Sequence, residues 1–306
     1  MGFFDCLLLL TATVGLSVHR IARGGMGTIK HAQLTTSAML STPMLGYMRL
    51  GIGLFQLVLL FTRMAKGPFT TMCNDEVTTC IPYGGVWILS TFTMWCWVAQ
   101  GVYFVLSGLV TLGTIPLSDN LAFFLCVMYE VQLCVSLLVT LAVSCVLVPM
   151  LEHKLSTFQG TAKQLAALKN REAVLNLPFA VMVHTSNLWF MLLELSCNRL
   201  PFDPSHFPFV LLWATLYGLF AWVFHHVNGI WYYFFLDYQR PYAVFSYCCL
   251  MGCLILFFRI ASAVTTIKGK GSMQRYVFQL ALFLSVFSVF LYTFKEMTRQ
   301  GYFATA

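Results

Sequence analysis

Charged residues are scarce in this chain. Asp, Glu, Lys and Arg make up 9% of the 306 residues, whereas hydrophobic residues make up 59%. Soluble domains carry roughly a quarter charged residues, so the composition excludes an ordinary soluble protein. The net charge of +7 is spread over short loops. No loop gathers the basic run that a nucleic-acid-binding surface needs, and we expect no nucleic-acid partner.

Several signatures of reactive or metal-binding sites are also missing. The sequence has no HExxH, GxSxG or glycine-rich phosphate loop, and no CxxC pair marks a zinc or iron–sulfur site. His225 and His226 are adjacent. Their side chains would diverge by about 100° on a helix and could not easily hold one metal ion. We therefore expect neither a metal nor a cofactor.

Long apolar runs are what the chain has in abundance. A membrane-spanning helix needs about 20 mostly apolar residues. A shorter run, FFDCLLLLTATVGLSV, opens the chain, and seven more follow, at 44–62, 84–112, 120–150, 178–197, 208–227, 241–265 and 275–294. The fold class predicted is all-α, a polytopic transmembrane helical bundle with seven or eight hydrophobic segments, and the protein is expected to be an integral membrane protein in contact with lipid.

The order of the spans places three loops on one side of the membrane. Loops 63–83, 151–177 and 228–240 are separated by pairs of spans, so all three share a side whatever the overall orientation. The polar insert 152–176 has helical spacing of apolar residues, which favours a helix at the membrane interface. Cys73 and Cys80 lie in the first of these loops. They would form a disulfide if the loop faces an oxidising compartment, and would otherwise stay free.

Ionisable residues inside spans are costly and usually face a cavity or the bundle interior. His184 and Thr91 enter the bilayer from the same side and, at 1.5 Å per residue, reach a similar depth of roughly 10 Å. A hydroxyl beside an imidazole can be a nucleophile with its general base. Alternatively, the threonine bonds its own helix and the histidine bridges two helices.

Two glutamates within the predicted spans have other interpretations. Glu130 lies in the middle of span 120–150, where it would serve either a proton path or a contact between helices. Glu194 lies near the far end of its span, away from Thr91. The span 208–227 exits on the same side as the three loops, where it carries the polar group His225, His226, Asn228 and Trp231.

Three stretches together resemble one family. YGGVWILSTF (83–92) resembles a YGGxWxxLTF motif, MVHTSNLWFMLLEL (182–195) resembles a helix with His-Thr followed by Glu, and WVFHHVNGIWYYFFLD (222–237) resembles WVHHxTGxWVYPxLE. Their order and spacing are similar to those of the androgen-induced and androgen-dependent integral membrane threonine hydrolases, which are related to the rolling stone proteins. The resemblance covers roughly residues 44–265, a six-helix core. It leaves an N-terminal hydrophobic segment with a basic loop (1–43) and a further C-terminal transmembrane helix with a tail (266–306).

This resemblance implies a threonine nucleophile and a histidine base that cleave fatty acid esters of hydroxy fatty acids. Carried over by motif, the nucleophile falls on Thr91 and the base on His184. The chain departs from the pattern at Ser90, where the family has Leu, and at Gln100, which lies two residues late and would select Thr93 instead. On a helix, residues 91 and 93 point about 200° apart, so only one of them is expected to face the imidazole.

Further departures are Trp189 and Phe234, which stand where the family has proline.

Two functional hypotheses follow. In the first, the chain hydrolyses a lipid ester, and His225, His226, Asn228 and Trp231 polarise the oxyanion or form the rim of the chamber. In the second, it is a non-catalytic subunit that keeps the fold within a larger complex of membrane subunits. The expected location is the endomembrane system or the plasma membrane, with the mitochondrial inner membrane as the alternative.

Overall fold

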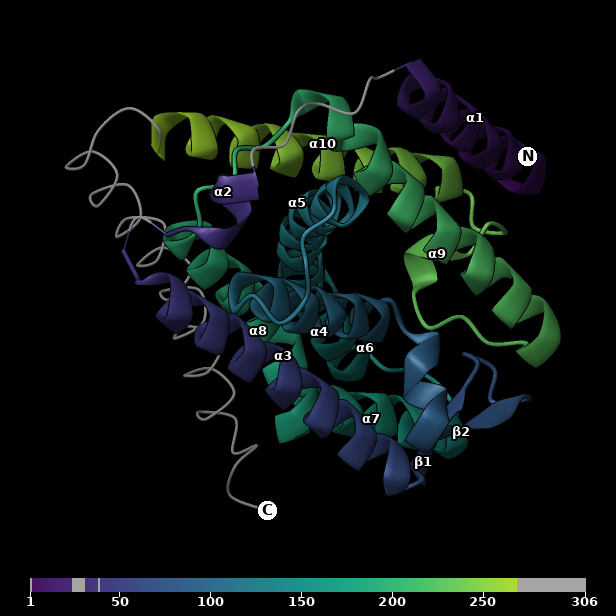
Figure 1. The fold of residues 1–306 in the computed structure, drawn as a ribbon. Helices are drawn as coiled ribbons and strands as arrows, with labels where there is room; N and C mark the ends of the chain where they lie inside the picture. Colours follow the sequence, from purple (N-terminus) through teal and green to yellow (C-terminus); the bar gives the residue numbers. More distant parts are fainter. Residues whose placement is uncertain (1, 24–30, 38, 269–306) are drawn as a thin grey trace.

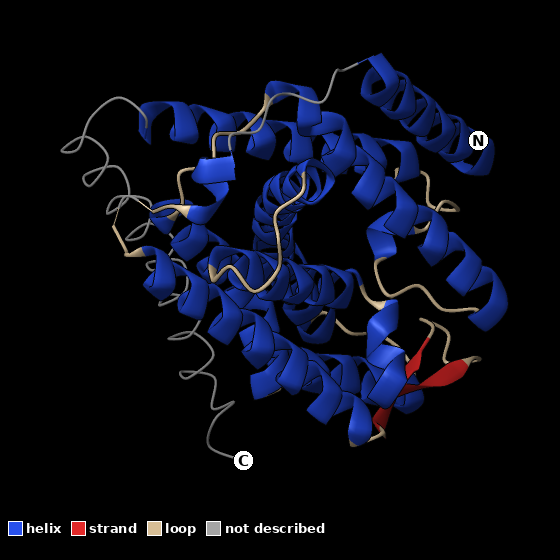
Figure 2. Cartoon of the chain, in the orientation of Figure 1, coloured by secondary structure: helices blue, strands red, loops and turns tan. Residues whose placement is uncertain are grey.

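The computed structural model describes residues 2–23, 31–37 and 39–268, and within them the chain is a bundle of helices with one short β-hairpin (Figures 1 and 2). The predicted all-α polytopic bundle is confirmed. The predicted span at 275–294 lies outside the described residues. The α-helices and strands are α1 (Gly2–Arg23), α2 (His31–Thr35), α3 (Thr42–Ala65), β1 (Pro68–Cys73), β2 (Cys80–Gly84), α4 (Phe92–Thr111), α5 (Asp119–Ala142), α6 (Val148–Ser156), α7 (Ala162–Asn176), α8 (Pro178–Cys197), α9 (Phe207–Asn228) and α10 (Ala243–Lys268).

Six helical segments among the described residues are long and apolar enough to cross a membrane. They are Gly2–Ile21, Thr42–Ala65, Phe92–Thr111, Asp119–Ser156, Pro204–Asn228 and Ala243–Thr266. The fourth is a continuous run through α5, a π-helical turn (Val143–Leu147) and α6. Its 38 residues exceed the roughly 20 that a bilayer requires.

Helix α8, predicted as a span, is as long as one but more polar than the six segments above. Its 20 residues correspond to roughly 30 Å. The polar side chains of Asn187 and Glu194 are fully buried, so they face the bundle rather than lipid. Just beyond the helix, Asn198 pairs with Ser37 through an isolated β-bridge. Helix α8 therefore carries its polarity on an inward face and links the two ends of the bundle.

Helices α3 and α4 pack closely because glycines line their interface. Gly46 and Gly53 on α3 face Gly108 and Gly101 on α4, seven residues apart on each helix. A Cβ atom added to Gly53 would lie 2.8 Å from the Gly101 carbonyl oxygen. Small residues let membrane helices approach at this distance, where packing and weak polar contacts replace the absent hydrophobic driving force.

Helix α5 is the central element of the bundle. It contacts α4, α8, α9 and α10, which surround it in Figure 1. Its buried side chains include Tyr129, Leu133 and Val135, none of them more than 1% exposed. The four neighbouring helices pack against these side chains.

One end of the bundle is closed by a buried ion pair. The Arg49 guanidinium Nε lies 3.1 Å from both carboxylate oxygens of Glu194, and both side chains are fully buried. Arg49 also donates to an α2 carbonyl at 2.8 Å and to the Thr111 hydroxyl at 2.7 Å. Glu194 accepts further hydrogen bonds from the Tyr103 hydroxyl and the Asn198 amide. Every charge in this group has partners, and the group ties α2, α3, α4 and α8 together.

A second buried pair lies at the same end. Glu130 on α5 is 2.9 Å from Nδ1 of His206 and accepts a hydrogen bond from the Asp203 backbone N–H at 2.8 Å. The turn that carries these two partners begins α9 through a short 3₁₀ helix (Pro204–His206). Of the two alternatives for Glu130, the structure shows the contact between elements.

Candidate functional site at the hairpin end of the bundle

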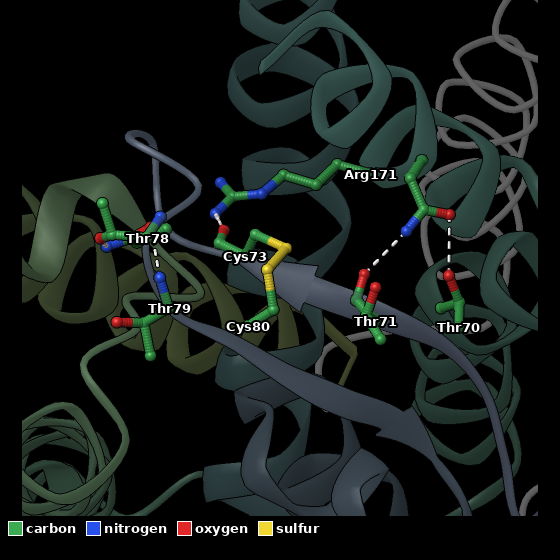
Figure 3. The surroundings of a disulfide bond; sticks show 9 residues. Thr70, Thr71, Cys73, Thr78, Thr79, Cys80 and Arg171 are labelled. Carbon is green, nitrogen blue, oxygen red and sulfur yellow. Dashed lines mark hydrogen bonds between the residues drawn. A yellow bond between two sulfur atoms is a disulfide. The ribbon is translucent and has the colours of Figure 1, made fainter. Parts of the chain in front are cut away.

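The loop between α3 and α4 forms the β-hairpin, and its two strands pair in antiparallel register. A disulfide joins Cys73 to Cys80, so the bonded alternative predicted for this pair is the one the structure shows (Figure 3). Asn170 on α7 donates to the Thr71 carbonyl at 2.7 Å, and Arg171 reaches the Cys73 carbonyl. The hairpin is thus fastened to α7, whose helical character the sequence predicted.

The two glycines of the YGG motif make the turn from the hairpin into the bundle. Gly84 and Gly85 have φ angles of 116° and 56°, in the region that side chains disfavour. A Cβ atom on Gly84 would also lie 2.5 Å from the Phe69 ring. After this turn the chain makes a 3₁₀ helix (Gly85–Ser90) rather than the start of an α-helix.

Thr91 interrupts the segment that the sequence predicts as one helix from 84 to 112. Its backbone is extended, with φ −94° and ψ 147°, and α4 starts only at Phe92. The prediction of a continuous helix is therefore wrong. A break inside a membrane protein is tolerated where neighbouring groups satisfy the freed backbone atoms, and two tyrosines, Tyr217 and Tyr233, do so here.

These tyrosines surround the break from α9 and the segment after it. Tyr217 donates to the Ser90 carbonyl at 3.1 Å, and the Tyr233 hydroxyl oxygen accepts the Phe92 backbone N–H at 3.2 Å. The Ser90 hydroxyl donates to the Tyr232 hydroxyl at 2.9 Å. Burial raises the pKa of the Tyr233 hydroxyl to about 12, so it stays protonated near neutral pH. The sequence motifs do not reveal these contacts, because each joins residues more than 120 positions apart in the chain.

A large cavity of about 620 Å³ opens beside the break. Thr91, Thr93, His184, His225 and Trp231 all line it. The structure therefore brings together the hydroxyl and the imidazole that loop order had placed on one side. Both threonines line this cavity, whereas the sequence led us to expect that only one of them faces the imidazole. Thr91 is not helical, so the 200° angle between the two side chains does not apply.

Thr91 and His184 line the same cavity without bonding to each other. The Thr91 hydroxyl donates to the Ile88 carbonyl at 3.0 Å. Nδ1 of His184 is buried and makes no well-formed hydrogen bond within the described part of the chain. The backbone of His184 is held by the Thr140 hydroxyl on α5, which donates to its carbonyl at 2.8 Å. The main chain of His184 is thus fastened to α5, while its ring lines the cavity.

The polar group at the end of α9 divides into two pairs. His225 lines the cavity and stacks on Trp231, with ring centroids 4.2 Å apart. His226 is exposed, and neither it nor Asn228 is among the described residues that line the cavity. Asn228 donates to the Phe224 carbonyl at 3.0 Å near the helix end. Of the four residues predicted for the rim, His225 and Trp231 line the cavity, and His226 and Asn228 do not.

Charged residues gather at the mouth of the cavity, and apolar residues form much of the remaining wall. Asp75 on the hairpin lies 3.1 Å from Arg240 and 3.8 Å from Arg171. Arg240 also pairs with Asp237 at 3.0 Å. Lys154 lines the cavity too, with no ion pair among the described residues. The apolar wall comprises Leu147, Met150, Leu151, Leu168, Val174, Leu175 and Ala180.

The three loops predicted to share a side all contribute to this cavity, through the hairpin, α6–α7 and the segment after α9. Within the described residues, no group of three His, Cys, Asp or Glu side chains could hold a metal ion.

Comparison with known proteins gave no relatives. No family model matches the chain, and neither a curated protein nor a solved structure matches it.

Proposed function

We propose that this protein is a membrane-embedded hydrolase of lipid esters, such as fatty acid esters of hydroxy fatty acids, with Thr91 as nucleophile and His184 as general base. The observation that carries the proposal is the single 620 Å³ cavity that holds both residues. Its charged mouth and apolar wall suit an amphiphilic substrate, whose polar end meets water while its chain stays out of it. The resemblance of the YGG, His-Thr and His-His segments to a threonine hydrolase family supports the same reading.

The proposed reaction proceeds through an acyl-enzyme. The Thr91 hydroxyl turns from the Ile88 carbonyl toward the imidazole, gives its proton to His184 and attacks the ester carbonyl carbon. The carbon–oxygen bond to the leaving alcohol then breaks, and the alcohol takes the proton from the imidazolium. Water attacks the acyl-threonine, again with His184 accepting its proton. Release of the acid returns that proton to the Thr91 oxygen and restores the starting state.

Charge on the attacked oxygen needs donors close to Thr91. The N-terminus of α4 begins one residue later, and its dipole favours a negative charge there. The Tyr233 hydroxyl lies 3.2 Å from the Phe92 backbone nitrogen and beside the Thr93 hydroxyl. Donors that are fixed in advance in this way stabilise the transition state without reorganisation. We assign the oxyanion role to this tyrosine and the α4 terminus rather than to His226 or Asn228.

The second candidate is a non-catalytic subunit of a membrane complex. One observation favours it: the Thr91 hydroxyl is bonded to the Ile88 carbonyl rather than to the imidazole. Such a threonine would simply stabilise the end of the 3₁₀ helix that precedes α4. Purified protein that is monodisperse and active without other subunits would contradict this candidate.

Three alanine variants separate these possibilities. Thr91→Ala and His184→Ala should lower the rate of lipid-ester hydrolysis by about 10²–10⁴-fold, the usual contribution of such groups. Thr93→Ala should keep most of the rate. The matched control is Thr62→Ala, an exposed threonine on α3 whose hydroxyl also bonds its own helix. Wild-type rates in both Thr91→Ala and His184→Ala would overturn the mechanism.

We further propose that the cavity mouth faces an oxidising compartment, because the Cys73–Cys80 disulfide lies at its edge. This favours the lumen of the endomembrane system or the cell exterior. Thiol alkylation of intact membranes, before and after reduction, measures the bond by mass spectrometry. Protection of both cysteines until reduction is expected, and two free thiols in native membranes would contradict the assignment.

A further inference from the structure

A second, smaller cavity of about 80 Å³ lies between α1, α5, α9 and α10. It shares three lining residues with the large cavity: Thr93, Leu147 and Tyr233. The two spaces therefore meet next to the proposed nucleophile. Its lining residues come largely from α5 and from the helices α1, α9 and α10, and Figure 1 shows α1 beside α9 and α10.

Away from Thr93 and Tyr233, which border the large cavity, the wall of this cavity offers little to a polar ligand. Most of its residues are aliphatic or aromatic, and the hydroxyls of Thr215, Tyr217 and Tyr247 are already committed. They donate to the carbonyls of Leu211, Ser90 and Leu236 at 2.8, 3.1 and 2.8 Å. An apolar space of this kind excludes water and takes hydrocarbon.

Two local features create the space. The π-helical turn after α5 places Val143 and Leu147 on the wall. On α9, Gly218 is buried, and an added Cβ atom would meet only the side chain of Leu10, at 3.9 Å. Leu10 belongs to α1 and is 1% exposed. The N-terminal helix, which lies outside the stretch that resembles the hydrolases, thus supplies part of the wall.

We propose that this cavity holds the hydrocarbon end of one acyl chain of the lipid substrate. The ester would lie at Thr91 beside Thr93, and the polar end of the lipid would lie toward the charged mouth. The proposal rests on the proposed function for the identity of the substrate. It gives α1 a role in that function, because the helix closes the tail site from one side.

Photolabelling tests the tail site without relying on hydrolysis. The probes are two long-chain fatty acids, one with a diazirine at the terminal carbon and one with it near the carboxyl group. The terminal probe should form adducts on α1, α9 and α10 wall residues such as Leu10, Leu250 and Met251. The second probe should label the large cavity. Terminal adducts confined to exposed residues of α3, such as Val58 and Phe61, would overturn the proposal.

A larger side chain placed in this cavity should limit the protein to substrates with shorter acyl chains. Gly218→Leu places a side chain in the space, whereas Gly252→Leu on α10 is the control, since Gly252 is exposed with nothing within 4 Å. Each methylene excluded from an apolar site lowers affinity about fourfold. Gly218→Leu should therefore lower the rate ratio of long to short acyl esters by about tenfold or more, and Gly252→Leu should leave it unchanged.

If the leucine variant fails to fold, Gly218→Ala, whose added methyl group would lie 3.9 Å from Leu10, should lower the same rate ratio by a smaller amount.

The proposed hydrolase and the proposed tail site would be contradicted by different results. Wall adducts without hydrolysis of any ester would remove the hydrolase and leave a tail-binding site. Hydrolysis with no wall adducts and no change in chain preference would keep the hydrolase and remove the tail site.

Discussion

The two ends of the bundle differ in how their buried acidic, basic and histidine side chains are paired. At one end, Arg49 and Glu194 are fully buried, and every charge meets several partners. At the other end, Nδ1 of His184 and Nδ1 of His225 are buried without a well-formed hydrogen bond in the described residues, and Thr91 breaks a helix. Unsatisfied buried groups are rare in folded proteins and call for an explanation. We therefore expect the first end to stabilise the fold, and the proposed ligand chemistry falls at the second.

The largest effect on this comparison should come from removing a charge at the end that holds Arg49 and Glu194, the closed end. Arg49→Met leaves the Glu194 carboxylate buried without its cation, which should cost about 3–5 kcal/mol of stability. Thermal unfolding of the purified protein in detergent measures this loss. Arg259→Met is the control, because Arg259 is exposed on α10.

Replacing both partners, with Arg49→Met and Glu194→Leu, should recover much of the loss, since an apolar pair leaves no charge unpaired. An Arg49→Met variant as stable as the Arg259→Met variant would show that the closed end does not hold the bundle together.

At the cavity end, loss of one donor should affect the rate and leave the fold in place. Tyr233→Phe removes the hydroxyl that accepts the Phe92 N–H and lies beside Thr93. The value of kcat for ester hydrolysis should fall by about 10²–10³-fold, with little change in KM, as for other oxyanion donors. The exposed Tyr47→Phe is the control. A loss confined to KM would assign Tyr233 to binding instead.

Packing between α3 and α4 gives a smaller effect that does not involve the cavity. Gly53→Leu would force a side chain to within 2.7 Å of Val105 and 2.8 Å of the Gly101 carbonyl. Overpacking of this kind should cost about 1–3 kcal/mol, measured by thermal unfolding. Gly51→Leu, two residues away with open space around it, should be neutral. Equal stability of the two variants would contradict the observed helix contact.

The smallest effect has the opposite sign. His184→Leu removes a buried Nδ1 that makes no well-formed hydrogen bond in the described residues, and so should raise stability by about 1 kcal/mol while ester hydrolysis is lost. Removal of a functional group commonly has this consequence. His226→Leu, at an exposed position outside the cavity lining, should change neither quantity. A His184→Leu variant that is clearly less stable would mean that the imidazole serves the fold.

Much of the fold could be predicted from apolar runs and loop order. Among the described residues, six of the runs correspond to helices that could cross the membrane, and a seventh is α8, a helix with a buried polar face. Loop order also placed His184 and Thr91 on one side, and both line one cavity. These properties follow from the length and order of the apolar runs, which can be read directly from the sequence.

The details of the site could not be predicted in the same way. The break at Thr91 depends on hydroxyls from Tyr217 and Tyr233, more than 120 residues away. The angle of about 200° expected between the side chains of residues 91 and 93 assumed that both are helical, whereas Thr91 is extended. The charged mouth likewise joins Asp75 to Arg171 and Arg240 across long sequence separations. Spacing along one helix carries no information about such contacts.

The most direct test of the cavity end is fluorophosphonate labelling of the folded protein, with the adduct mapped by mass spectrometry. Such probes react with hydroxyls that a neighbouring base activates. An activated Thr91 predicts one adduct on its oxygen, which disappears in His184→Ala and in heat-denatured protein but persists in Thr93→Ala. An unlabelled Thr91 in active protein, or an adduct on Thr93 alone, would contradict the assignment of nucleophile and base.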